Sequence, residues 1–356
     1  MNHTIHKRAK CVFHGYVTST PQIRAKNSMR ISADYSADKC HPKGGYFLYH
    51  CLRRLFSFRK FMNTMKFFLI TVFLSLILFS CKRRQTKPEG PVNNSDPAFS
   101  NFFSGEVKPD PFSVCFNGAY YRKVVSSKDI WLGISGKVVL PIIIFDPLRS
   151  NPAKPGQYLD NPSVYLGGNM SGQETDIGLT WEVIKDKNGN ISADRRAFRP
   201  FLRRSAIPSQ GALYQNAPAD SLYYWYPGDE VTMSVQIIID KQIKFIVEGV
   251  GKRFETDFNC DGYGPNIPGQ FKRVNAIDQV NNEGKPVQPT NTQVENANWR
   301  ETNLFRTYQG KVVSVPVNAQ RYIDMRCPDP KYFRIVASEQ DQKRGAESIN
   351  ISGSGY

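Results

Sequence analysis

The feature that most constrains this chain is a series of short segments rich in β-branched residues, each closed by Gly, Pro, Asn or Asp. Residues 138–145 and 178–185 are of this kind, and the longest pair, 230–239 and 243–248, is joined tightly at residues 240–242. Segments with this composition fit the pleated surface of a sheet and predict strands. Further strands are predicted at 163–166, 222–226, 310–317 and 332–337.

Convincing helical periodicity is nearly absent, so the chain is expected to be all-β. Many short strands separated by turn residues predict a jelly roll or β-sandwich of two antiparallel sheets over residues 105–356. All-β single domains of roughly 250 residues are common. Asn188-Gly189, which follows the segment at 178–185, indicates a hairpin turn.

An uncharged apolar run of 13 residues lies ahead of this domain, at 67–79, between Lys66 and Ser80. A membrane-spanning helix needs about 20 apolar residues, so the run is short for a permanent span. A basic start, an apolar centre and a small residue at the end are typical of a secretory signal peptide. We therefore predict a signal peptide over residues 62–80.

Leu78-Phe79-Ser80-Cys81 resembles the lipobox of bacterial lipoproteins, as in the Bacteroidota. The resemblance implies that Cys81 is acylated, becomes the new N-terminus and anchors the protein to a lipid bilayer. Residues 81–104 are rich in Pro, Asn and charge and are expected to be a disordered, flexible tether. An Asp after the lipidated Cys would resemble an inner-membrane retention signal, and a run of acidic residues would resemble a surface-export signal. The residues after Cys81 contain neither. We expect an outer-membrane anchor that faces the periplasm.

Residues 1–61 precede two plausible starts, Met62 and Met65, and are expected to be a disordered gene-model extension. Residues 1–80 contain 13 Lys and Arg against two Asp, so 11 of the chain's 16 net positive charges lie there. The basic composition therefore belongs to a segment that export would remove, and no nucleic-acid partner is predicted.

Residues 223–231, YYWYPGDEV, followed by a long hairpin, resemble the concanavalin-like jelly rolls and specifically the glutamic peptidases, or eqolisins. That family is known for a Gln and a Glu on neighbouring strands of the concave face. The carboxyl group activates water and the amide steadies the developing oxyanion.

The family has its Glu three residues after a Trp, whereas in this sequence Glu301 lies two residues after Trp299. The family has its Gln two residues before a Gly, and here Asp176 lies two residues before Gly178, with Gln173 five residues before it. The resemblance makes Glu301, Asp176 and Gln173 the candidate catalytic residues. An Asp176–Glu301 pair would alternatively suit a glycosidase. Solvated carboxylates at strand edges are the third interpretation.

Aromatic residues are a second functional signal. Trp225, Tyr224, Trp299 and Trp181 could form a platform on which a sugar ring stacks, although core filling explains any one of them. The sequence thus predicts an anchored extracytoplasmic protein that binds carbohydrate or another cell-envelope ligand. A peptidase-like or glycosidase-like hydrolase is the alternative, and a structural component of an outer-membrane complex is the third hypothesis.

Asp257, Asn259 and Asp261 resemble the opening of a calcium loop, whose twelfth position here is Pro268 instead of Glu. Asx turns explain the same residues, so Ca²⁺ is an open alternative and no other cofactor is predicted.

The cysteines that follow Cys81 are Cys115, Cys260 and Cys327, of which two can pair in an oxidising compartment; the sequence does not say which. All five histidines precede residue 51, so Ser-His-Asp catalysis and a His-ligated zinc are not expected after Cys81.

Overall fold

The computed structural model describes residues 102–182, 188 and 197–356. Residues 1–61, the expected signal peptide, Cys81 and the tether up to residue 101 lie outside the described residues, as does most of the expected turn at 188–189. Within the described ranges, no helix has the length and apolar character needed to cross a membrane.

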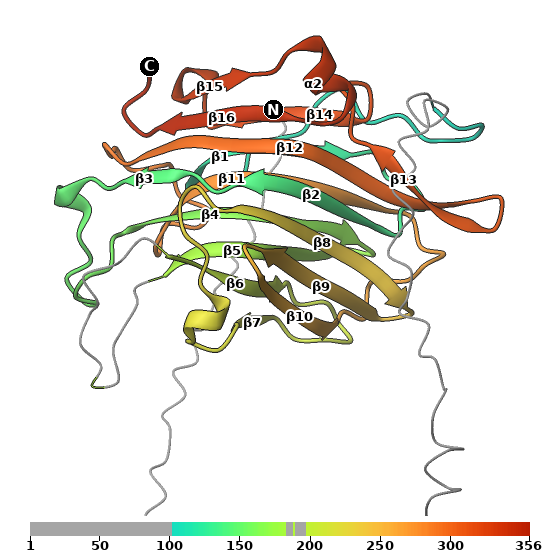
Figure 1. Ribbon diagram of the computed structural model, residues 1–356, viewed down its shortest axis with the longest axis horizontal. Helices are drawn as coiled ribbons and strands as arrows, with labels where there is room; N and C mark the ends of the chain where they lie inside the picture. Colours follow the sequence, from blue (N-terminus) through green and yellow to red (C-terminus); the bar gives the residue numbers. More distant parts are fainter. Residues whose placement is uncertain (1–101, 183–187, 189–196) are drawn as a thin grey trace, which may run out of the picture. The chain divides into compact units, whose positions relative to one another are not determined.

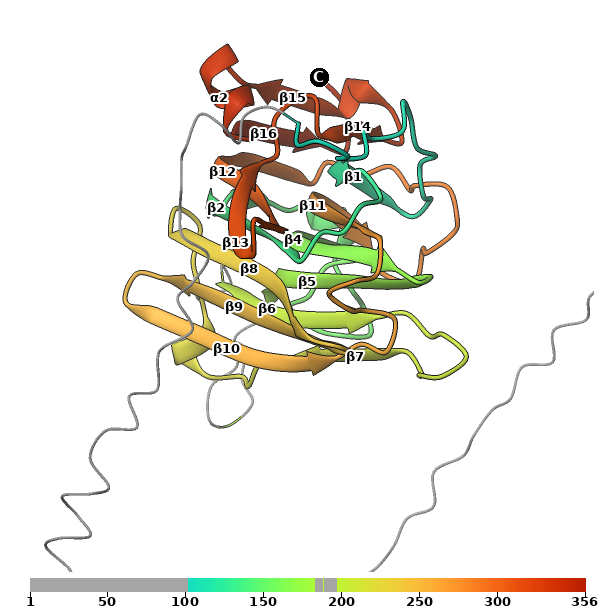
Figure 2. The ribbon, with the colours of Figure 1, turned by 90° about the vertical axis from the view of Figure 1, so that its right-hand side faces the viewer.

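The described chain folds into two antiparallel sheets that face each other as two layers (Figures 1 and 2), which confirms the predicted all-β sandwich. The first sheet has seven strands. Strands β4, β5, β6 and β7 follow one another along the chain and lie side by side at one end of the sheet, and β11, β1 and β14 complete it on the other side of β4. In spatial order they are β14 (Tyr322–Cys327), β1 (Ala119–Ser126), β11 (Gly269–Gln279), β4 (Asp160–Met170), β5 (Gln173–Glu182), β6 (Ala197–Arg204) and β7 (Leu213–Asn216).

The second sheet has nine strands and is centred on the long strand β12. Its main path runs through β10 (Lys252–Asn259), β9 (Gln242–Gly249), β8 (Glu230–Ile239), β2 (Gly133–Val139), β12 (Gln293–Tyr308), β16 (Glu347–Ser352) and β15 (Phe333–Val336), while β3 (Ile142–Ile144) and β13 (Lys311–Pro316) also pair with β12. The described helical elements are short, and comprise the 3-10 turns η2 (Pro147–Arg149), η3 (Ser221–Tyr223) and η4 (Pro330–Tyr332) and the helix α2 (Glu339–Lys343).

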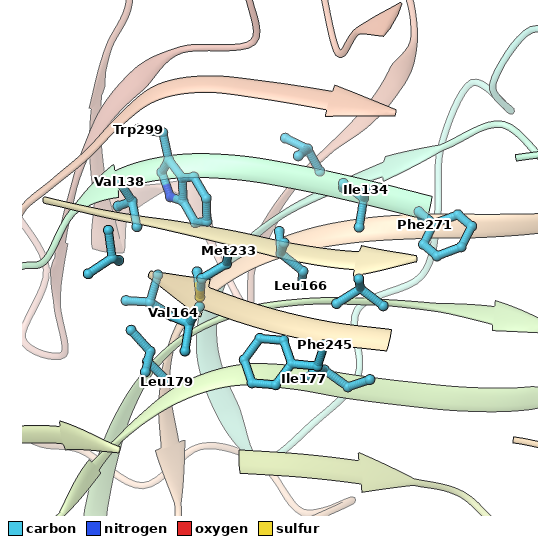
Figure 3. Close-up of a cluster of buried hydrophobic side chains, with 14 of the residues drawn as sticks. Ile134, Val138, Val164, Leu166, Ile177, Leu179, Met233, Phe245, Phe271 and Trp299 are labelled. Carbon is cyan, nitrogen blue, oxygen red and sulfur yellow. The ribbon is translucent and has the colours of Figure 1, made fainter. Parts of the chain in front are cut away.

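The core lies between the sheets, because alternate side chains of each strand point inward (Figure 3). Fully burying one such aliphatic or aromatic side chain stabilises the fold by about 1.5–3 kcal/mol. The residues labelled in Figure 3 come from both layers: Val164, Leu166, Ile177, Leu179 and Phe271 from the first sheet, and Ile134, Val138, Met233, Phe245 and Trp299 from the second.

Most of the strands predicted from the sequence are confirmed. The two longest form the hairpin of β8 and β9, and Lys241 in its turn has a φ of 63°. Residues 163–166 lie inside β4, and residues 178–182 form the end of β5. The strands expected at 310–317 and 332–337 correspond to β13 and β15.

Two strand predictions are corrected. Pro141 separates β2 from β3 within residues 138–145, since proline has no N–H to donate to a ladder. Residues 222–226 were expected to be a strand, but they begin in the 3-10 turn η3. The Asp220 side chain caps that turn by accepting a backbone hydrogen bond, and Trp225 follows with a single isolated bridge.

The cysteine pairing is resolved: Cys115 and Cys327 form a disulfide with their Cα atoms 5.7 Å apart, and Cys260 is buried and free. The disulfide attaches the segment before β1 to strand β14, which is an edge of the seven-stranded sheet. We call residues 107–116 of that segment the strap.

Candidate functional site

A cleft of ≈ 430 Å³ hollows the outer face of the seven-stranded sheet. Strand alternation creates it: on β4, Val164 and Leu166 enter the core, while Ser163 and Tyr165 face outward into the cleft. Strands β1, β11, β5, β6 and β7 contribute their outward residues to the same hollow. The principal ones are Tyr121, Lys123, Asp176, Thr180, Phe201, Arg203, Tyr214, Lys272 and Asp278.

One side of the cleft is a row of aromatic rings. The Tyr165 and Phe201 ring centroids are 5.9 Å apart at 75°, and those of Phe201 and Tyr214 are 5.9 Å apart at 21°. Tyr214 is 53% exposed. Gly178 pairs with Tyr165, and a Cβ there would come within 2.6 Å of the tyrosine Cβ, so glycine is what leaves room beside this ring. Phe201 is buried, so Tyr214 is the ring of this row that a ligand can reach, with Phe201 and Tyr165 packed behind it.

A fixed charge network crosses the floor of the cleft. Lys272, Gly167, Asp176 and Arg203 are register neighbours on four consecutive strands, and Gly167 places no side chain between Lys272 and Asp176. The Asp176 carboxylate lies 2.6 Å from both the Lys272 Nζ and the Arg203 Nη1. Burial raises the pKa of Asp176, but the two cations outweigh it and hold that pKa below 3.8. Asp176 is therefore ionised and immobile.

Asp278 is another carboxyl group that lines the cleft, and it behaves differently from Asp176. Burial is the largest influence and, with the Asp176 charge, it raises the pKa of Asp278 to about 6, against the opposing hydrogen bond from Ser163 Oγ at 2.7 Å. Arg203 and Lys272 act in the opposite direction to burial and are weaker. The cleft thus combines one permanently charged carboxylate with one that exchanges a proton near neutral pH.

The expected pairing of Asp176 with Glu301 is wrong. Glu301 lies on β12 of the other sheet, directly opposite Lys137 of β2. A β-bulge between Trp299 and Glu301 inserts one residue, so Trp299 points into the core and Glu301 points to the outer face of the nine-stranded sheet. The two carboxylates therefore lie on opposite outer faces of the sandwich.

Gln173 is not in the cleft either. It lies three residues from Asp176 on β5, so its side chain points to the other face, where it is fully buried. Its Oε1 accepts from the Gly262 N–H at 2.9 Å, and its Nε2 donates to Gln210 Oε1 at 2.8 Å. Gln173 therefore holds two loops against the sheet.

The four residues predicted to form a sugar-binding platform do not form one. Trp225, Tyr224 and Trp299 are buried, and the indole N–H groups of the two tryptophans donate to protein acceptors, Trp299 to Asn275 Oδ1 at 2.6 Å. Trp181 is only partly buried, but it packs against the core. No two of these four share an exposed surface, and the exposed ring of the aromatic row is instead Tyr214.

The calcium candidates lie along an extended segment. Asp257 and Asn259 belong to β10, and Asp261 follows in the next turn. Asp257 forms an ion pair with Lys244 at 3.2 Å, and the Asn259 carbonyl accepts from Arg204 at 3.0 Å. Among the described residues, no three His, Cys, Asp or Glu side chains are grouped as metal ligands. Calcium binding at this segment stays a prediction.

Sequence reasoning missed most of the cleft. Tyr165 lay in a predicted strand between two apolar residues, so its alternation with them could have placed it on the outer face. Lys272 and Asp278 lie on β11, which was not predicted as a strand. On that strand Val274 and Ala276 share the outward face with Lys272 and Asp278, whereas Arg273 and Asn275 point inward, so no period of two in hydrophobicity marks the strand.

The fold and its cleft define a class: a two-sheet β-sandwich with an open, aromatic and charged cleft on one outer face. No family model and no curated protein matches the sequence.

Among solved structures, the chain is similar to a scytalido-glutamic peptidase bound to a peptide-based transition state analog (TM-score 0.38, 10% identity, covering 65% of this chain and 97% of that one). It is similar to SCP-B, an eqolisin peptidase bound to the tripeptide Ala-Ile-His (TM-score 0.36, 11% identity, 65% and 97%). It is also similar to porphyranase B from Zobellia galactanivorans (TM-score 0.20, 10% identity, 67% and 63%). At these scores the similarities define neither a family nor an activity for this chain.

Proposed function

We propose that the protein binds a glycan in the cleft on the outer face of the seven-stranded sheet. The observation that supports this most is the exposed Tyr214 ring, stacked on Phe201 and bordering a floor of hydrogen-bonding side chains. A sugar ring has an apolar C–H face for stacking and hydroxyl groups around its edge, so it matches both surfaces. The cleft volume of ≈ 430 Å³ lies within the range of about 300–1,000 Å³ for ligand pockets.

The charges of the cleft also suit an uncharged polyol. Asp176 pairs with both Lys272 and Arg203, and Glu174 and Glu283 pair with the same two cations, so the floor presents donors and acceptors without a dominant sign. A hydroxyl group can donate to a carboxylate and accept from a cation, whereas a charged ligand would be repelled by half of these groups. Because the network is already assembled by ion pairs, little ordering is needed when a ligand binds.

Isothermal titration with cello-, laminari- and galacto-oligosaccharides tests the proposal. Tyr214→Ala removes the exposed ring of the aromatic row and is expected to weaken binding about tenfold, or about 1.4 kcal/mol. Tyr356→Ala is the matched control, since Tyr356 is 49% exposed and does not line the cleft. Equal affinities for the two variants, or no binding by the wild-type protein across the three series, would refute glycan binding at this site.

Hydrolysis is the second candidate, and Asp278 favours it. A carboxyl group with a pKa of about 6 beside an ionised carboxylate is the arrangement in which one group can donate a proton to a leaving group. Release of product from dye-labelled polysaccharides and from casein, measured between pH 4 and 8, tests this. Activity that is lost in Asp278→Asn and kept in Tyr356→Ala supports hydrolysis, and the absence of product leaves binding alone.

We also infer that Cys81 is lipidated and that the domain lies outside the cytoplasm, anchored to the outer membrane on its periplasmic side. The apolar run at 67–79 and the Cys115–Cys327 disulfide support this, since disulfides persist in oxidising compartments. Labelling of cells with radioactive palmitate should mark the wild-type protein and not Cys81→Ser. Equal labelling of both proteins would contradict the assignment.

A further inference from the structure

A second cavity, of ≈ 210 Å³, adjoins the cleft on the same outer face. Lys123, Glu174 and Lys272 line both hollows, so the two lie side by side. The sheet side of the second cavity includes Asn169 and Gln270, which are paired in register on β4 and β11. The two hollows together therefore extend over more of the outer face than the aromatic cleft alone.

The strap supplies the opposite wall of this second cavity. Asp110, Phe112 and Ser113 line it, and Phe116, at the end of the strap, lines the main cleft. Phe112 is 74% exposed, so its ring is available beside the cavity. An exposed ring next to amide and ammonium groups repeats the chemistry of the main cleft in a smaller space.

The strap is fastened at its two ends and not between them. At its start the Val107 N–H donates to the Asp129 carboxylate at 3.1 Å, next to the buried ion pair of Glu106 with Arg321. At its far end it is held by the disulfide of Cys115 and by the Phe116 N–H, which donates to the Tyr121 hydroxyl at 2.7 Å. No hydrogen bond joins residues 109–114 to another part of the described chain.

We propose that the strap and the second cavity form an extension subsite for a further sugar unit of the chain bound in the main cleft, and that the Cys115–Cys327 disulfide holds this subsite together. The inference rests on the proposed function and specifies its ligand as an oligosaccharide longer than the main cleft. Because residues 109–114 form no hydrogen bond of their own to the rest of the described chain, breaking the disulfide leaves the far end of the strap held by the single Phe116–Tyr121 hydrogen bond. This loosens the wall of the second cavity and leaves the aromatic row of the main cleft in place.

Chain-length dependence of binding tests the subsite. In titrations with the disaccharide and the hexasaccharide of the cello-, laminari- and galacto- series, the wild-type protein is expected to bind the hexasaccharide of its preferred series about tenfold more tightly than the disaccharide. Phe112→Ala and the double variant Cys115→Ala/Cys327→Ala are expected to lose this difference and to keep the disaccharide affinity. Phe112→Ala retains the disulfide and so tests the subsite even if the double variant fails to fold.

Val114→Ala is the matched control, because Val114 is 80% exposed on the same strap and lines neither hollow. It should behave as the wild-type protein does. Binding that is independent of chain length, or a hexasaccharide preference that survives in Phe112→Ala, overturns the subsite and leaves the proposed function standing. Absence of all binding overturns the proposed function and the subsite together.

Discussion

Replacement of Asp278 by asparagine should change the pH dependence of stability in a way that reveals the proton it holds. The substitution keeps the shape of the side chain and a carbonyl oxygen that can accept from Ser163 Oγ, and it removes the charge. In the folded protein the pKa of Asp278 is raised to about 6, mainly by burial and further by the charge of Asp176. In the unfolded chain the pKa of the same group is its ordinary value of 3.8.

The sign follows from proton binding. Between about pH 4 and pH 6 the folded protein holds the Asp278 proton more tightly than the unfolded chain does, so this group makes the free energy of unfolding fall as the pH rises through that window. The rise in the pKa of Asp278 from 3.8 to about 6 lowers the free energy of unfolding by about 3 kcal/mol above pH 6 and by almost nothing below pH 4. Asp278→Asn lacks this loss, so it should be more stable than the wild-type protein at pH 8 by up to about 3 kcal/mol.

Urea unfolding at pH 4 and at pH 8, followed by tryptophan fluorescence, measures the two free energies for each protein. Glu339→Gln is the control. Glu339 is exposed in the short helix α2, and the substitution removes a charge from a residue that does not line the cleft. It should alter stability slightly and equally at both pH values. The reasoning is refuted if the difference between Asp278→Asn and the wild-type protein is the same at pH 4 and pH 8.

Three further substitutions or reagents test the interior. Glu347→Gln should lower the free energy of unfolding by about 3–5 kcal/mol in urea, because it leaves two buried arginines without their shared carboxylate; a loss below 1 kcal/mol would contradict this. Trp299→Phe should cost about 2 kcal/mol or more by the same assay, since Asn275 loses its donor. Cys260, whose pKa burial raises to about 12, should resist iodoacetamide at pH 8 until urea is added, and rapid labelling of the folded protein would be inconsistent with its burial.

The strands that the sequence predicts well are those whose inward positions are all apolar. The hairpin of β8 and β9 places Val231, Met233 and Val235 inward, and its alternation is visible without a structure. Strand β11 hides the same alternation, because Arg273 and Asn275 take inward positions. Their partners come from β12 and β16 or the loop before it, and a period of two in hydrophobicity cannot reveal a polar side chain that tertiary contacts satisfy.

The site is less predictable than the fold for a similar reason. Asp176 was identified from its spacing to a glycine, but its neighbours Lys272 and Arg203 depend on the order of four strands across the sheet. An exposed platform of tryptophans was one of two interpretations of the sequence, and their large apolar area favours the other, burial between the sheets. Tyr214 carries no local signal, because its strand β7 is a four-residue edge.

A crystal structure of the protein with a bound hexasaccharide tests the central claim, that the cleft on the seven-stranded sheet is a glycan site, most directly. The account predicts a sugar ring stacked on Tyr214, with hydroxyl groups within hydrogen-bonding distance of Asp278, and further units passing Lys123 toward the strap. A glycan bound on the outer face of the nine-stranded sheet, around Glu301 and Lys137, with the cleft empty, would contradict it.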